Sequence, residues 1–255
     1  MEDYLYKRMI YIGKNRIHYS EIDSTNSELK RIFATEEITE GTLLTTNFQS
    51  SGQGQRGESW ESAPGANFLG TYLLNPNINP REVFVLNIIA SLAVKETIAE
   101  LTQSEVSIKW PNDIIVNGAK IAGILVDNKI ISSKIVASFI GIGLNINQLE
   151  FSDFPRSATS IRKIIHKKVE NESVIQKLNF HIQQFYSLFN LKGFETLNFL
   201  YHQNLYLKGE SQFYEVETGI KKFTLQSVNK EGCLQLFNNS GEIEVFGIKE
   251  ITFLK

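Results

Sequence analysis

A glycine-rich segment with a single cation lies between two predicted strands, within residues 50–66. Its glycines are Gly52, Gly54, Gly57 and Gly65, and its cation is Arg56. Because glycine has no Cβ atom, backbone N–H groups in such a segment can approach a ligand closely, and a run of them forms a concave anion site. A guanidinium adds a planar fork of donors that suits phosphate. The segment predicts a loop that holds a negatively charged group, with a surface loop that binds nothing as the alternative.

The same glycines match the spacing of a dinucleotide-binding fingerprint, Gly52-x-Gly54-x-x-Gly57. That fingerprint needs a helix directly after the glycines, so that a pyrophosphate meets the helix N-terminus. Here Pro64 and Gly65 follow within a few residues, and no apolar stripe of helical period lies between them and the loop. The spacing therefore does not indicate a dinucleotide fold.

A second cation, Lys109, ends a short predicted strand and precedes the turn signal WPND at residues 110–113. An ammonium at a strand end can meet a phosphate or a carboxylate as a point charge. Taken alone, a solvated surface lysine is the commoner case. Beside the glycine-rich loop, Lys109 becomes the second candidate for binding an anion.

Small polar residues at a helix start form a third candidate group. The segment Asp23-Ser24-Thr25-Asn26 precedes an apolar stripe of helical period, and Thr25 and Glu28 have the spacing of a capping box. Helix capping alone explains such residues in most proteins. Two or three small polar side chains at a helix N-terminus can also line a pocket for a polar ligand.

The composition limits the classes of function. With a net charge of −2, the chain lacks the basic field of a general nucleic-acid binder, so a phosphate must be held by local cations. The single cysteine, Cys233, excludes an internal disulfide and fits a reducing compartment. None of the 4 histidines has a second ligand at metal-binding spacing, which predicts no protein metal site. We find no signal segment and no apolar run that could span a membrane, which predicts a cytoplasmic protein.

The elements that must position these residues alternate between strand and helix. Strands are predicted over residues 17–22, 41–48, 67–74, 106–109, 114–116, 119–126 and 135–146, and helices after Asp23 and over 80–101, 174–190 and 193–200. Short strand-like segments follow at 213–216, 221–228, 233–237 and 243–246. The pattern predicts an α+β fold, with a mixed sheet flanked by helices over residues 1–204 and a small β-barrel-like domain over 205–255 that packs on it.

Taken together, these segments resemble the biotin–protein ligase family. The matching segments are Asp23-Ser24-Thr25-Asn26, Gln49-x-x-Gly52-x-Gly54-x-Arg56-Gly57, Lys109-Trp110-Pro111-Asn112-Asp113, Ala122-Gly123-Ile124-Leu125 and Gly141-x-Gly143-x-Asn145. They occur in the order and at the spacing of the family, over about residues 17–147. The resemblance implies a class II synthetase-like catalytic domain and an SH3-like β-barrel at the C-terminus.

The resemblance also implies a two-step reaction. Biotin and ATP, with Mg²⁺, give biotinyl-5′-adenylate and pyrophosphate, and a lysine of a biotin carboxyl carrier domain then takes the biotinyl group. Lys109 and Arg56 are implied as the catalytic cations, which neutralise the biotin carboxylate and the α-phosphate, and the loop amides would wrap the adenylate. The residues implied for biotin and its adenylate are Ser24, Thr25, Asn26, Gln49, Gln53, Gly54, Gln55, Lys109 and Gly123. Those implied for the nucleotide are Gly52, Gly54, Arg56, Gly57, Trp60, Asn112 and Asn145.

The chain departs from the family pattern at two places. The family usually carries Arg or Lys where this chain has Gln53 and Gln55. The sequence therefore does not decide which loop side chain, if any, holds the phosphate, or how well the intermediate is retained. Too few residues precede the first matching strand for the N-terminal DNA-binding domain of some members, so no DNA binding is expected. Pairing of two copies through the central sheet is expected from other members.

Three other interpretations remain at this point. A lipoate or octanoate ligase shares the catalytic fold, although segment 109–113 and the glycine-rich loop resemble the biotin branch better. A non-catalytic, biotin-dependent regulator would bind biotin without releasing pyrophosphate. A plain nucleotide-binding protein would hold ATP equally well with or without biotin.

Overall fold

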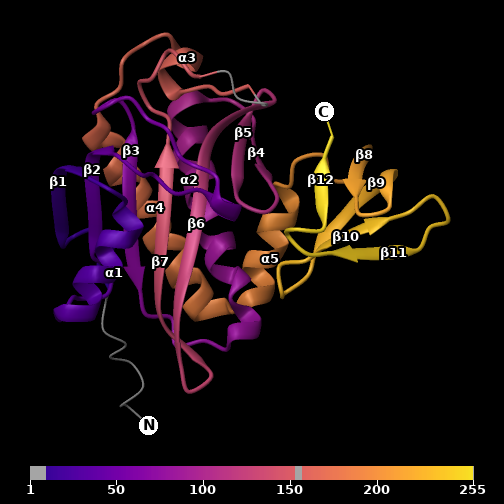
Figure 1. The fold of residues 1–255 in the computed structure, drawn as a ribbon, viewed down its shortest axis with the longest axis horizontal. Coiled ribbons are helices and arrows are strands. Elements are labelled where there is room, and N and C mark those ends of the chain that lie inside the picture. Colours follow the sequence, from indigo (N-terminus) through magenta and orange to yellow (C-terminus); the bar gives the residue numbers. More distant parts are fainter. Residues whose placement is uncertain (1–9, 153–156, 255) are drawn as a thin grey trace.

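A mixed seven-stranded sheet with the order β1-β2-β3-β7-β6-β5-β4 forms the larger part of the protein (Figure 1). The structure is a computed structural model, and it describes residues 10–152 and 157–254, with the side chain of Arg56 outside the description. The strands are β1 (Arg16–Ile22), β2 (Leu43–Gln49), β3 (Phe68–Leu74), β4 (Val106–Lys109), β5 (Asp113–Val116), β6 (Ala119–Ile131) and β7 (Lys134–Leu144). β1 and β2 run parallel, and all other neighbours run antiparallel. The sheet and its helices confirm the predicted α+β class.

Helices cover both faces of this sheet. α2 (Phe84–Thr102), α4 (Asn171–Lys192) and α5 (Phe194–Gln203) pack together on one face, whereas α1 (Thr25–Thr35) packs on the other. The alternation of side chains along β3 separates the two faces, because Tyr72 and Leu74 join the core around α2 while Leu73 joins the cluster around α1. α2 is buried around most of its circumference, which explains its apolar sequence.

A five-stranded antiparallel sheet with the order β11-β10-β9-β8-β12 follows α5, and Figure 1 shows the two side by side. Its strands are β8 (Ser211–Val216), β9 (Gly219–Val228), β10 (Leu234–Phe237), β11 (Ile243–Phe246) and β12 (Ile251–Phe253). Tyr214 and Leu234 belong to the same buried cluster as Phe84, so the core continues across the contact. Trp110 Nε1 donates across it to the Gly232 carbonyl oxygen at 2.9 Å. The small β domain therefore packs on the larger part, and the division at residue 204 stays a prediction.

The start of α1 differs from the predicted capping box. Ser24 is the N-cap, and its Oγ accepts from the Ser27 N–H at 3.4 Å. Thr25 is the first helical residue, and its hydroxyl turns toward neighbouring strands instead. Glu28 binds Arg31 rather than the helix start. The predicted box was wrong by one residue because Ser24 and Thr25 are both good caps, and only the packing of the helix on the sheet decides between them.

The boundaries of several elements differ from the predicted ones. The first turn of the 80–101 helix is a separate 3-10 turn at Pro80–Glu82, and β6 continues to Ile131. The short helix α3 (Ile161–Ile165) and strand β12 had no counterpart in the sequence-based assignment, because segments of 5 and 3 residues carry too little periodicity. In the described ranges, none of the helices combines the length and apolarity that a membrane crossing requires.

Candidate active site

One cavity gathers most of the residues that the sequence singles out. It lies between the N-terminus of α1, the loop after β2, the turn at residues 110–113, strands β6 and β7, and strand β12. The sequence-predicted residues that line it are Thr25, Asn26, Gln49, Gln53, Gly54, Gln55, Trp60, Lys109, Asn112 and Gly123. The fold therefore brings the helix start, the glycine-rich loop and the strand-end lysine to one place.

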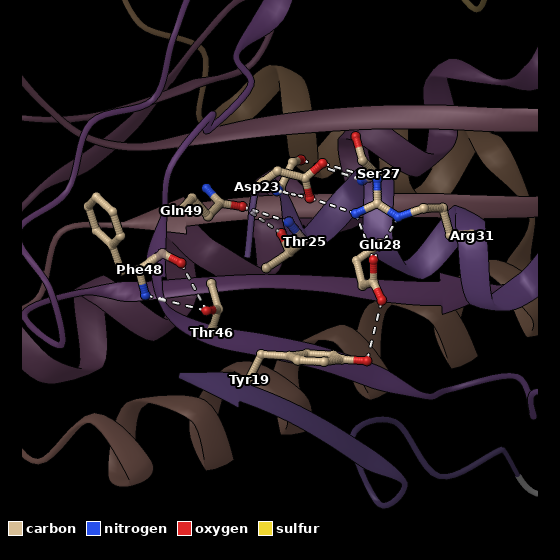
Figure 2. A network of polar contacts seen from close by, with 10 residues as sticks. Tyr19, Asp23, Thr25, Ser27, Glu28, Arg31, Thr46, Phe48 and Gln49 are labelled. Atoms are coloured by element: carbon tan, nitrogen blue, oxygen red, sulfur yellow. Dashed lines mark hydrogen bonds and ion pairs between the residues drawn. The ribbon is translucent and has the colours of Figure 1, made fainter. Parts of the chain in front are cut away.

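A chain of hydrogen bonds supports the floor of this cavity. It joins Thr25 and Gln49, which line the cavity, to Thr71, which does not. Gln49 Oε1 accepts from both the backbone N–H and the hydroxyl of Thr25, at 2.8 and 3.0 Å, as Figure 2 shows. The Thr71 hydroxyl donates to the Thr25 hydroxyl at 2.9 Å. Because Oε1 is used in this way, the amide nitrogen of Gln49 is the part of the side chain left to offer N–H donors to a ligand.

Asn26 extends the floor on the other side of Thr25. Its side chain is only 3% exposed and lines the cavity. Nδ2 donates to Asp127 Oδ2 on β6 at 2.9 Å, whereas the buried Oδ1 has no hydrogen-bond partner in the described part of the chain. At the entry to α1, hydrogen bonds from Arg31 hold the pKa of Asp23 below its ordinary value (Figure 2). The helix start is therefore braced both inside and outside the cavity.

Lys120 on β6 is a cavity residue that the sequence analysis missed. Its Nζ lies 2.7 Å from Asp113 Oδ1 and 5.6 Å from the ring centroid of Trp60. The Lys120 side chain is 27% exposed and the Asp113 side chain 11%, so the pair is largely shielded from water. One sequence signal could have found it, since Lys120 is the only charged residue between Asp113 and Asp127. Charged side chains are rarely buried unless they are paired, so a single lysine within an otherwise apolar hairpin indicates a candidate functional residue.

Lys109 lies in the same cavity, at the border with the C-terminal sheet. Its Nζ is 5.0 Å from the ring centroid of Phe253 and 5.9 Å from that of Tyr206. Both distances suit a cation–π interaction. Ile251 and Thr252 line the cavity next to Phe253, so β12 forms one of its walls. The C-terminal sheet therefore completes a site that the sequence analysis assigned to the larger domain alone.

The glycine-rich loop is closed on itself. The Gly54 N–H donates to the Glu58 carbonyl at 2.7 Å, and the Trp60 N–H donates to the Gly52 carbonyl at 2.9 Å. A 3-10 turn at Gln55–Gly57 allows these two short arms to pair, and no helix follows, as predicted. The expected cradle of open amides is therefore absent at Gly54, because its N–H is used within the loop. The side chain of Arg56, predicted as catalytic, lies outside the described residues.

The indole of Trp60 lies on a platform of two glycines from neighbouring strands. A Cβ at Gly143 would overlap this ring, and one at Gly123 would come within 3.0 Å of it. The ring nitrogen Nε1 is buried and has no hydrogen-bond partner among the described residues. These contacts give the physical reason for the glycines at both positions, which is the close approach of an aromatic ring to the sheet.

Four predicted residues do not line the cavity. The Ser24 hydroxyl caps α1, and Gly52 and Gly57 belong to the closed loop. Asn145 follows β7, and its Nδ2 donates to the Thr159 carbonyl at 3.0 Å. The roles in binding proposed for these residues stay predictions.

The carboxylates on the cavity wall are those of Glu58 and Asp113. Within residues 10–152 and 157–254, no group of three or more His, Cys, Asp or Glu side chains comes together as a metal site would require. Two carboxylates in a cavity suit a cation that is bound mainly by phosphate oxygens and water, as Mg²⁺ usually is.

Comparison with known proteins points in one direction. Residues 19–145 match the model of the biotin/lipoate A/B protein ligase family. The bifunctional ligase/repressor BirA of Bacillus subtilis is 28% identical over 247 residues, which cover 92% of this chain and 73% of that protein. The biotin–[acetyl-CoA-carboxylase] ligase of Paracoccus denitrificans is 32% identical over 126 residues, 49% of this chain and 51% of that protein. The biotin protein ligase of Aquifex aeolicus in complex with biotin and ATP superimposes with a TM-score of 0.78 and 26% identity, covering 95% of this chain and 99% of that one.

Proposed function

The chain belongs to the biotin/lipoate A/B protein ligase family, and we propose that it is an ATP-dependent biotin–protein ligase. One observation carries this proposal: a single cavity combines a floor of amide and hydroxyl groups with two lysines. The floor suits the polar ring of biotin, and the lysines suit a carboxylate and a phosphate. The Aquifex aeolicus relative was solved with both biotin and ATP, which supports the same pair of substrates.

In the first step, a carboxylate oxygen of biotin attacks the α-phosphorus of ATP, and the bond between that phosphorus and the pyrophosphate oxygen breaks. Both reactants are anionic, so the main task of the protein is to bring them together and to stabilise the charge between them. Lys120 offers an ammonium that Asp113 holds in place, and Lys109 offers a second one beside Phe253. Mg²⁺ bound to the triphosphate would neutralise further charge, with Asp113 and Glu58 as the nearby carboxylates.

The glycine-rich loop is the part that would enclose the product of this step. The mixed anhydride of biotin and AMP is hydrolysed by water, so it must be shielded until the acceptor arrives. Between Gly52 and Trp60 the backbone bonds that close the loop lie within the loop itself, so residues 53–59 can rearrange while Trp60 stays packed on β6 and β7. In the second step an uncharged lysine amine attacks the acyl carbon, and AMP leaves with the electrons of the broken C–O bond.

The acceptor we propose is the biotin carboxyl carrier domain of a carboxylase. The name of the Paracoccus denitrificans relative, which specifies acetyl-CoA carboxylase, supports this class of acceptor. We place the reaction in the cytoplasm, where ATP and such carboxylases occur together. Pairing of two copies through the central sheet and the absence of DNA binding also stay predictions, and analytical ultracentrifugation and a gel-shift experiment with operator DNA test them.

The decisive experiment is exchange of labelled pyrophosphate into ATP, with biotin, lipoate and octanoate run in parallel. Exchange that depends on biotin alone is the expected result, because pyrophosphate is released only when the adenylate forms. Exchange with lipoate or octanoate would move the chain to the other branch of its family. Binding of biotin without any exchange would make it a biotin-dependent regulator instead.

A further inference from the structure

We infer that Asp127 is a positioning residue for substrate recognition. It fixes the side-chain amide of Asn26 so that Oδ1 accepts a hydrogen bond from a ring N–H of the substrate, and Lys30 holds Asp127 in place. This inference rests on the proposed function and adds the residues that distinguish biotin from the other acids used in the family.

Hydrogen bonds connect the buried Asn26 on the cavity floor to Asp127 and Lys30, which are partly exposed. Asn26 and Lys30 lie one turn apart on α1, and both contact Asp127 Oδ2 on β6. Lys30 and Asp127 have side-chain exposures of 39% and 37%, whereas Asn26 is 3% exposed. A Cβ atom added to Gly141, in the middle of the sheet, would lie 3.7 Å from the amide carbon of Asn26. The charged pair therefore sits behind Asn26, on the side away from the cavity.

The chemistry of these groups fixes the orientation of the amide. A carboxylate can only accept hydrogen bonds, so the NH₂ group of Asn26 must face Asp127. Oδ1 then points the other way, and it is buried without a partner among the described residues. A buried acceptor without a donor is unfavourable, so the orientation is one that a ligand N–H would satisfy. Without Asp127, the amide could turn over and offer its NH₂ group to the cavity.

The neighbouring amide has the opposite orientation. Two hydrogen bonds from Thr25 hold Gln49 Oε1, so its amide nitrogen offers donors. The floor therefore presents an acceptor at Asn26 and donors at Gln49. This pattern complements a cyclic urea, in which N–H groups flank a carbonyl. Lipoate and octanoate carry no N–H group at the corresponding end, so they leave Oδ1 unsatisfied and are rejected.

A purely structural role for Asp127 predicts a different result. As an ion pair partner of Lys30 alone, it would add a small amount to stability and would not affect which ligand binds. The variant Asp127→Leu separates the two roles, since it keeps the approximate size of the side chain but removes the acceptor that fixes the Asn26 amide. Glu172→Gln is the matched control, because Glu172 forms an ion pair of 2.6 Å with Arg16 and does not line the cavity.

The experiment measures the dissociation constants of two biotin analogues by calorimetry. Each analogue is a cyclic carbamate in which one of the two ring N–H groups is replaced by oxygen. The unaltered protein and Glu172→Gln should bind the isomer that lacks the N–H facing Asn26 about 10- to 100-fold more weakly than the other isomer. In Asp127→Leu this ratio should approach one, because the turned Asn26 amide can donate to the ring oxygen.

Two results would overturn the inference: equal binding of both isomers by the unaltered protein, or an unchanged ratio in Asp127→Leu. If Asp127→Leu does not fold, as judged by thermal unfolding, Lys30→Met provides the second test. It removes the ammonium that holds Asp127 in place, so a smaller reduction of the ratio is expected, whereas an unchanged ratio overturns the inference. Failure of the proposed function is a separate outcome, since the unaltered protein would then not bind biotin itself.

Discussion

The floor of the cavity and the loop that borders it are held in different ways. In the floor, Thr25, Gln49 and Thr71 come from α1, β2 and β3, and every hydrogen bond joins one element to another. In the loop, Gly54 and Trp60 donate only to carbonyls a few residues away. The core therefore fixes the floor before a ligand arrives, whereas residues 53–59 of the loop can change shape while Trp60 stays packed on β6 and β7. We infer that the acid meets a preformed site and that enclosure of the nucleotide requires movement.

The largest effect is expected where the two regions meet, at Lys120, which contacts the ring of Trp60 from the loop and Asp113 from the sheet. Lys120→Met keeps most of the apolar contacts of the side chain but removes its charge. We expect biotin-dependent pyrophosphate exchange to fall about 10³-fold, because a preorganised donor to the developing charge is lost. Steady-state exchange rates at saturating biotin and ATP measure this.

Lys177→Met is the matched control for Lys120→Met. Lys177 on α4 pairs with Glu100 on α2 at 2.8 Å and does not line the cavity. Its exchange rate should equal that of the unaltered protein. Lys109→Ala should also slow exchange, and a larger loss there than in Lys120→Met would mean that Lys109, rather than Lys120, contributes most to stabilising the developing charge.

The second prediction tests whether the floor is preformed. Gln49→Leu removes the acceptor of two hydrogen bonds from Thr25. We expect the free energy of unfolding to fall by about 1–3 kcal/mol, because a buried N–H and a hydroxyl lose their partner. The KM for biotin should rise about 100-fold while the KM for ATP stays unchanged. A matching rise in the KM for ATP would show that floor and loop do not act separately.

The third prediction addresses the loop. Gly143→Ala places a methyl group where the Trp60 ring lies, so the end of the loop must move. We expect the KM for ATP to rise about tenfold, with the dissociation constant of biotin unchanged and the tryptophan fluorescence altered. Gly247→Ala is the control, since its methyl group would lie 3.4 Å from the nearest atom and outside the cavity. Weaker biotin binding in Gly143→Ala would contradict the separation of the two regions.

The same contrast explains how far the sequence alone could predict the site. Local signals identified the helix start, the glycine-rich loop and Lys109, because capping residues, glycine density and strand ends are each read from a few neighbouring positions. They could not separate Ser24 from Thr25 as the cap, since that choice depends on Gln49 and Thr71 in other strands. They also did not show that the loop closes on itself. The pairing of its two sides depends on the 3-10 turn at Gln55–Gly57, and three residues are too few to show a periodic pattern.

Residues joined only by the tertiary fold escaped prediction. Lys120 meets Asp113 across a hairpin, and Asn26 meets Asp127 between α1 and β6, at a separation of 101 residues. Strand β12 has 3 residues and no readable alternation, yet it forms a wall of the cavity. The fold class was predicted correctly because long elements have periodic patterns. Apart from Lys120, whose isolated charge could have marked it, the missed part of the site consists of contacts that no local pattern encodes.

The smallest expected effect concerns the C-terminal sheet, whose strand β12 forms a wall of the cavity. His202 at the end of α5 accepts a hydrogen bond from the Val228 N–H of β9 at 2.9 Å and so ties this sheet to the larger part. Burial lowers the pKa of His202 below its ordinary value of 6.5. The neutral ring therefore contributes stability that is fully present above pH 6.5 and is lost as the pH falls through the lower pKa of the folded protein.

Urea unfolding at pH 7.5 and pH 5.0 tests this link, with His202→Gln as the variant that cannot titrate. The carboxylates, such as Asp23, contribute equally to both proteins, so the difference between the two pH dependences isolates His202. The unaltered protein should lose more stability on acidification than His202→Gln. If it does, activity at low pH should fall through both the KM for biotin and the KM for ATP, because β12 forms a wall of the cavity proposed to bind both. An equal loss of stability in both proteins would mean that His202 does not control how the C-terminal sheet is held against the cavity.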